Sequence, residues 1–177
     1  MIPRQGGFSL IEVLVTIAIL MIGLLGLAAL QTNATVAEME AYQRSQALVL
    51  VQDMVDRIAA NKNNASSYLV TAAGGATQDC TALTGAALDV WEWNNKLAGA
   101  AEVTAGGTKV GAMIGARGCV TQPTAGARVY VVAVAWQGMR QVSFSTPGYT
   151  CGVGLYGTGK RRFVSQVVRV PLLGTTS

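Results

Sequence analysis

The strongest constraint on this chain is a run of 25 consecutive uncharged residues, Val13 to Ala37, between Glu12 and Glu38. The first 18 residues of the run are almost all Val, Leu, Ile, Ala, Met or Gly. A helix needs roughly 20 such residues to cross the hydrocarbon core of a bilayer. We therefore expect a membrane-spanning helix near the N-terminus.

The helix is expected to continue well beyond the apolar run. From Phe8 to about Lys62 there is no proline, and the only glycines are Gly23 and Gly26. A helix of about 55 residues would be roughly 80 Å long at about 1.5 Å per residue. Past Leu30 the apolar residues recur at spacings of three and four, which predicts an amphipathic second half that packs on a partner. The apolar positions are Val36, Met39, Ala47, Leu48, Val51, Met54, Val55 and Ile58, and the predicted stop is at Asn61, Asn63 and Asn64.

The remainder of the chain is long enough for one compact head. We interpret Tyr68 to Thr84 as a connecting loop and Ala86 to Ala98 as a short helix, in which Trp91 and Trp93 cannot share a face, so that one is core and the other rim. Strands are predicted at Met113 to Thr121, Arg128 to Gln137, Gln141 to Ser145 and Phe163 to Pro171. They are expected to form an antiparallel meander.

The second of these strands has apolar residues on both alternating faces from Val129 to Trp136. A strand of this kind belongs inside a sheet. We expect one of its faces to pack against the amphipathic part of the long helix, because that stripe also needs a partner.

The composition argues against hydrolases with a histidine-containing triad and against the usual zinc sites. The chain has no histidine, the commonest general base near neutral pH and the commonest metal ligand. Cys80, Cys119 and Cys151 form no close C-x-x-C pair, so we expect disulfide chemistry outside the cytoplasm, with one thiol left over. The pattern predicts no catalytic residue, metal site or cofactor.

Charge is distributed unevenly along the chain. Residues 1–102 hold 5 basic and 9 acidic residues, whereas residues 103–177 hold 8 basic and none acidic. The basic side chains could form a contact surface for DNA, lipid headgroups or an acidic pilin, or they could be the solvated edge of a sheet. The residues of this candidate patch are Arg128, Arg140, Lys160, Arg161 and Arg162.

The segment before the apolar run carries a specific motif. Gly7-Phe8-Ser9-Leu10-Ile11-Glu12 resembles the G-F-x-x-x-E class III signal of type IV pilins and type II secretion pseudopilins. The resemblance implies that residues 1–7 are a leader, that a prepilin peptidase cuts between Gly7 and Phe8, and that Phe8 is then N-methylated.

Glu12 stands out because a carboxylate in a membrane helix costs a few kcal/mol unless it is paired. The resemblance implies that its partner is the N-terminal amine of a neighbouring subunit, which becomes available after cleavage. Glu12 would then act as a register signal for assembly.

Later segments resemble one minor-pilin subfamily, the type IV pilus modification proteins (PilV). Leu88 to Leu97 looks like its D-x-W-E-W-x-x-x-L helix, and Val134-Ala135-Trp136-Gln137-Gly138, Cys151-Gly152 and Arg161 to Ser165 follow in the expected order. The resemblance also favours a Cys119–Cys151 disulfide, similar to the loop staple of pilin C-terminal regions, with Cys80–Cys119 as the alternative.

These resemblances imply an α+β type IV pilin fold and a non-enzymatic subunit of the minor-pilin complex that primes assembly or caps the filament tip. The implied partners are other minor pilins, the major pilin, the prepilin peptidase, the inner-membrane assembly platform and, as a further candidate, a large tip adhesin. The location would be the inner membrane with a periplasmic head, and later the pilus tip.

Two other functions remain open on the sequence: a type II secretion pseudopilin, and a minor pilin that binds DNA or a surface. In either case we expect the same division of the chain. Its parts are the leader (1–7), the membrane and filament-core helix (8–30), the amphipathic half of that helix (31–62), the connecting αβ-loop with a short helix (63–112) and the sheet with the C-terminal loop region (113–177).

Overall fold

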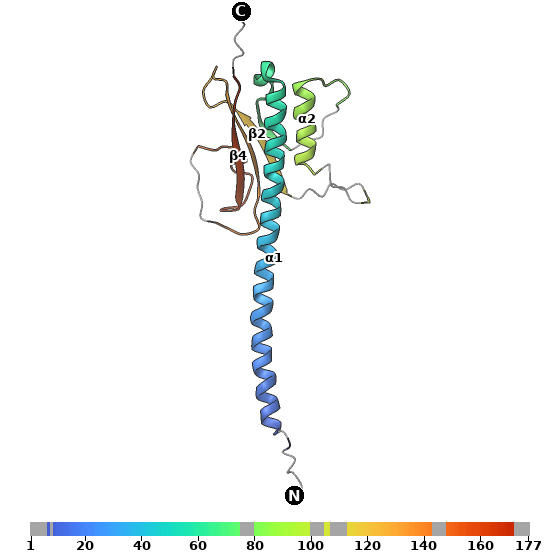
Figure 1. Cartoon of the computed structure of the whole chain (residues 1–177), viewed down its shortest axis with the longest axis vertical. Helices are drawn as coiled ribbons and strands as arrows, with labels where there is room; N and C mark the ends of the chain where they lie inside the picture. Colours follow the sequence, from blue (N-terminus) through green and yellow to red (C-terminus); the bar gives the residue numbers. More distant parts are fainter. Residues whose placement is uncertain are drawn as a thin grey trace, which may run out of the picture. The chain divides into compact units, whose positions relative to one another are not determined.

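The computed structural model describes residue 7 and residues 9–74, 80–99, 105–106, 113–142 and 148–171. It is an α+β structure with a long helix and an antiparallel sheet (Figure 1). The described elements are α1 (Leu10–Ala60), the 3-10 helix η1 (Lys62–Tyr68), β1 (Val70–Ala73), α2 (Ala86–Leu97), β2 (Ile114–Thr121), β3 (Val129–Gln137) and β4 (Arg161–Arg169). The chain divides into two compact units, Met1–Met39 and Glu40–Ser177, and each is described by itself.

Helix α1 begins at Leu10, within the class III motif. The Ser9 carbonyl accepts hydrogen bonds from the backbone N–H groups of Glu12 (3.0 Å) and Val13 (3.3 Å). At the other end the asparagines stop the α-helix as predicted, and Asn64 donates its side-chain amide to Asn61 Oδ1 at 2.9 Å. The chain then continues as η1, so the α-helix ends two residues before the expected Lys62.

The sheet has the strand order β1-β2-β3-β4 with antiparallel neighbours, which confirms the predicted meander. Strand β3 lies between β2 and β4, as its two apolar faces indicated. One expectation was wrong: β1 lies inside the segment interpreted as a loop, and it pairs Val70 with Val120. Of the strand expected at residues 141–145, positions 143–145 lie outside the described residues, and Gln141 and Val142 are not in a strand.

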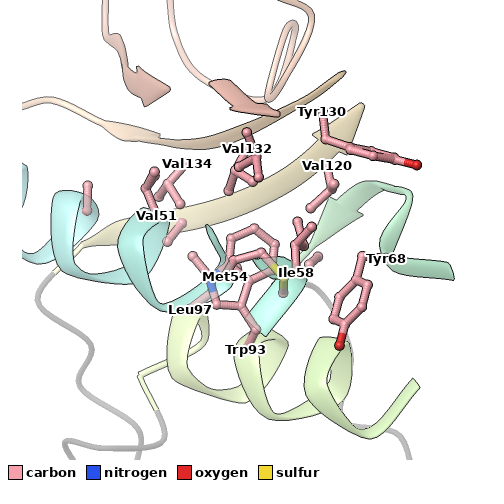
Figure 2. Packing of buried hydrophobic residues seen from close by; sticks show 14 of the residues in the cluster. Val51, Met54, Ile58, Tyr68, Trp93, Leu97, Val120, Tyr130, Val132 and Val134 are labelled. Carbon is pink, nitrogen blue, oxygen red and sulfur yellow. The ribbon is translucent and has the colours of Figure 1, made fainter. Parts of the chain in front are cut away.

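Alternate residues of β3 face two separate clusters. Tyr130, Val132, Val134 and Trp136 are buried in the main core, together with residues of α1 and α2. Figure 2 shows this packing, in which Val51, Met54 and Ile58 of α1 and Trp93 and Leu97 of α2 meet the sheet. Burial of each such side chain contributes roughly 1.5–3 kcal/mol.

The other face of β3 meets a smaller cluster. Ala133 and Ala135 are buried there with Cys119 and Cys151, and Tyr156 and Phe163 pack around them. The sheet is therefore covered on both faces, by helices on one side and by the loop before β4 on the other.

The amphipathic stripe of α1 differs in part from the prediction. Ala47, Val51, Met54 and Ile58 are buried as expected. Leu48 is 51% exposed and Met39 is 47% exposed, whereas the polar Gln43 is buried. The spacing of three and four correctly predicted the buried face of α1 in its last turns. It did not identify the apolar residues, such as Leu48, that lie outside this buried face.

Candidate functional site

The predicted cleavage site includes Gly7, which is exposed, with nothing within 4 Å of the position where a Cβ would stand. Residues 1–6 of the predicted leader, and Phe8, lie outside the described residues. Glu12 is exposed in the first turn of α1. An acidic side chain at this end of a helix interacts favourably with the helix dipole.

Beyond Glu12, α1 exposes the apolar residues of the predicted span. Leu14, Ile19, Leu24 and Leu30 are each more than half exposed. By length and composition α1 is able to cross a membrane. Since water disfavours an exposed apolar surface of this kind, the segment requires a bilayer or other apolar helices around it.

In the head, a cluster of ion pairs around Arg57 joins α2 to α1. The Arg57 guanidinium bonds Asp53 (3.3 Å), Asp89 (2.7 Å) and Glu92 (2.8 Å). Partial burial lowers the pKa of Arg57, but the hydrogen bonds and charges of the three carboxylates outweigh it and raise the pKa above its ordinary value. Lys96 adds a second link to Asp53 at 3.0 Å.

The two tryptophans of α2 have the different roles that their spacing predicted. Trp93 is fully buried and donates its Nε1–H to the Leu50 carbonyl at 2.8 Å. Trp91 is half-buried and lines a groove of about 600 Å³ between α2 and β1. Trp93 therefore anchors α2 on α1, and Trp91 lies at the rim.

Strand β2 leaves room for Trp93 at Gly118. A Cβ on Gly118 would overlap the Trp93 indole and come within 2.6 Å of Leu97 Cδ1. The absence of a side chain at this position is therefore what allows α2 to approach the sheet.

The loop before β4 is fixed to the sheet at two points. A disulfide joins Cys119 to Cys151 (S–S 2.01 Å), the pairing that the resemblance favoured, and Cys80 is a free thiol. The Tyr156 hydroxyl lies 2.8 Å from the Gly115 carbonyl and 3.0 Å from the Ala135 carbonyl, and burial raises its pKa to about 12.

Sequence reasoning missed Tyr156. Its signal was present, because it is an isolated aromatic residue within the glycine-rich segment Gly152 to Gly159. An aromatic ring with a polar tip is suited to anchor such a loop on a sheet.

The structure does not bring the basic residues together as one free surface. Arg162 pairs with Glu40 at 3.3 Å and donates to the Arg140 carbonyl at 2.7 Å, while Arg161 donates to the Tyr149 and Cys151 carbonyls at 2.9 Å each. Lys160 adjoins these two arginines. Arg128 lies at the opposite end of the sheet, because Val129 pairs with Arg169 and Gln137 with Arg161.

Comparison with known protein families matches the two parts of α1 and the start of the head. A model described as the prokaryotic N-terminal methylation motif matches residues 2–28. A model described as type IV pilin Tt1218 matches residues 29–91. The comparisons with curated proteins and with solved structures gave no significant match.

An N-terminal methylation motif, an apolar helix and an antiparallel head define a membrane-anchored subunit that is built to be processed and assembled into a filament. This chain belongs to the type IV pilins, and it has their α+β fold. Type IV pilins are structural proteins and not enzymes. Members of the family associate with other pilins and with the prepilin peptidase. They are first anchored in a membrane and are then incorporated into the pilus.

Proposed function

We propose that this pilin is a minor subunit of a type IV pilus, of the type IV pilus modification (PilV) kind, in a complex that primes assembly or caps the tip. The supporting observation is the architecture of α2. Apart from Trp91, the motif residues of α2 that carry the subfamily resemblance also hold α2 in place: Asp89 and Glu92 bind Arg57, and Trp93 and Leu97 are buried.

The proposed life cycle has two stages. The leader 1–7 is removed between Gly7 and Phe8, and residues 8–30 hold the subunit in the inner membrane with the head in the periplasm. Residues 8–30 then enter the filament core, where Glu12 meets the Phe8 amine of a neighbouring subunit. Such a pair in a low-dielectric setting is valuable chiefly for register.

Glu12→Ala tests the assembly stage. The variant should be inserted and cleaved normally, because it removes a charge from the membrane segment. Its amount in sheared filaments, or its co-purification with other pilins, should fall at least tenfold relative to cleaved protein in the membrane. Glu38→Ala is the matched control, since it removes another exposed acid of α1 outside the apolar run. Wild-type incorporation of Glu12→Ala would contradict the proposed pairing.

A gene deletion separates a minor pilin from a type II secretion pseudopilin. The proposal predicts fewer surface pili and unchanged protein export. Normal piliation with lost export would identify a pseudopilin instead.

Binding of DNA is less favoured, because Arg161 and Arg162 are engaged in contacts within the head. Salt-dependent retention of the full chain on duplex DNA would overturn this preference, since phosphate contacts weaken steeply with salt.

A further inference from the structure

The two outer strands of the sheet differ in how their edges are protected. Strand β1 has four residues and its pairing with β2 is irregular between Val70 and Ala73. Strand β4 has nine residues, and it pairs with β3 without a register shift from Arg161 to Arg169. Proteins usually shorten, bend or charge an edge strand to prevent further pairing. Strand β4 is long and regular, and its interior from Phe163 to Val168 is uncharged.

The register identifies which backbone groups of β4 point away from the sheet. Gly138 N–H bonds the Lys160 carbonyl at 2.7 Å, and Val170 N–H bonds the Arg128 carbonyl at 2.9 Å. Both pairs lie on the β3–β4 register, so even-numbered residues of β4 are the ones that bond β3. The N–H and C=O groups of the odd-numbered residues, including Ser165 and Val167, therefore face the outer edge.

The outer edge is open along the second half of β4, as far as the described residues show. Just before the strand begins, the outward-facing Gly159 carbonyl accepts a hydrogen bond from Val142 N–H at 2.9 Å. In the second half, Ser165, Gln166 and Val167 are exposed, and Val167 is 53% exposed. The first half lines a cleft of about 440 Å³. The cleft is lined by Glu40, Arg44, Trp136, Val142, Arg161, Arg162, Phe163 and Val164. Figure 1 shows β4 at the border of the sheet.

Charge at the edge selects the partner. Arg44, Arg161 and Arg162 lie at the start of β4 and Arg169 lies at its end, whereas Glu40, the acidic residue of the cleft, already pairs with Arg162. Antiparallel pairing of β4 with β4 of a second copy would place Arg161 and Arg162 against Arg169. Like charges opposite each other destabilise such a pair, which disfavours self-association.

We propose that the outer edge of β4 binds an extended strand of a different protein, with acidic side chains near both ends and uncharged residues between them. Ser165 and Val167 supply main-chain hydrogen bonds to that strand. Arg44 and Arg169 attract its acidic ends. Addition of a strand to a sheet edge is a general mode of peptide recognition, in which main-chain bonds give affinity and flanking side chains give specificity.

A designed peptide tests this proposal on the full chain in detergent micelles. The probe is fluorescently labelled Asp-Glu-Val-Thr-Val-Thr-Val-Glu-Asp, and the control peptide carries Lys at the four acidic positions. We expect the acidic peptide to bind, the lysine peptide to bind at least tenfold more weakly, and amide hydrogen exchange at Ser165 and Val167 to slow on binding. Equal binding of the two peptides would overturn the charge argument.

Ser165→Pro removes one outward N–H and leaves the bonds to β3 intact, because a proline is tolerated on the free side of an edge strand. It should weaken binding of the acidic peptide by up to about tenfold, as expected for one lost hydrogen bond. Ser165→Thr keeps the N–H and is the matched control. Unchanged affinity of a folded Ser165→Pro variant would exclude the edge as the binding site.

A charge-swapped variant tests the same site independently of the proline. Arg44→Glu combined with Arg169→Glu changes two exposed side chains and should reverse the preference toward the lysine peptide. Retained preference for the acidic peptide would contradict the proposal. These assays use no filament, so their failure is distinguishable from a failure of the proposed minor-pilin role, which is tested by Glu12→Ala and gene deletion.

Discussion

Tyr156 shows how one side chain can link two strands to a loop. Its hydroxyl lies between carbonyls of β2 and β3, and its single proton can be donated to only one of them at a time. Burial removes the water that would stabilise the negative oxygen of the ionised form, and this effect outweighs the opposing charges of Arg117 and Arg161. This explains why its pKa rises to about 12 from an ordinary value near 10.

The predicted consequence is a loss of stability at alkaline pH. Because the folded pKa lies above the unfolded one, the contribution of Tyr156 is fully present below about pH 10 and is lost as the pH rises through about 12. Titration of tyrosinate absorbance should therefore show a late component that is missing in Tyr156→Phe. That variant should also lose about 1 kcal/mol of stability at neutral pH. A late component that persists in Tyr156→Phe would show that another tyrosine is responsible.

At the residue scale, the sequence predicted the two tryptophan roles but left the cysteine pairing to resemblance. Spacing on a helix determines which residues share a face, so Trp91 and Trp93 could be separated. The connection between Cys119 and Cys151 depends on strand register and loop path, and neither follows from spacing in the chain.

At the scale of elements, α2 depends on a glycine in another element. Gly118→Ala should push the Trp93 indole out of its place and lower the free energy of unfolding by about 1–3 kcal/mol, as overpacked cores do. Gly157→Ala is a suitable control, because the nearest atom to its added Cβ is Lys160 Cδ at 3.7 Å. Thermal unfolding of the two variants gives the comparison. Equal stability would show that α2 can shift without cost.

The disulfide should stabilise the head chiefly by lowering the conformational entropy of the unfolded chain. Cys119 and Cys151 are 32 residues apart, which corresponds to roughly 3–4 kcal/mol in the chain-entropy model. Cys151→Ser should therefore lower the denaturation midpoint, whereas Cys80→Ser should leave it nearly unchanged. Thiol counting should find one free thiol in the native chain, and a count of three would contradict the disulfide.

Elements with a clear local pattern were predictable, including the short helix α2, whereas the four-residue strand β1 was not. The apolar run and the absence of proline determine α1 over most of its length, and the dense apolar pattern of β3 determines its central position. Strand β1 has the sequence Val-Thr-Ala-Ala next to Gly74 and Gly75, so only its first two residues favour a strand, and the alanines and glycines after them do not. It is a strand because β2 is beside it, and a partner distant in sequence leaves no local signal.

At the scale of the whole molecule, the class III motif predicts one processing event. Replacement of Gly7 by a larger residue should leave the leader attached, because the peptidase must reach the backbone at this position. Intact-mass measurement of the membrane fraction should show an N-terminus at Phe8 in the wild type and at Met1 in the variant. A wild-type N-terminus at any other residue would contradict the motif assignment.

The two faces of β3 also have a consequence for how the head opens. Even-numbered residues of β3 pack on helices, and odd-numbered residues pack on the disulfide-linked loop. A reductant acts on the second face alone. Amide exchange in reducing buffer should then accelerate around Tyr149 to Tyr156 while the last turns of α1 remain protected, so that the head behaves as two cooperative units sharing one strand. The exchange rates of β3 itself would follow the more stable of the two.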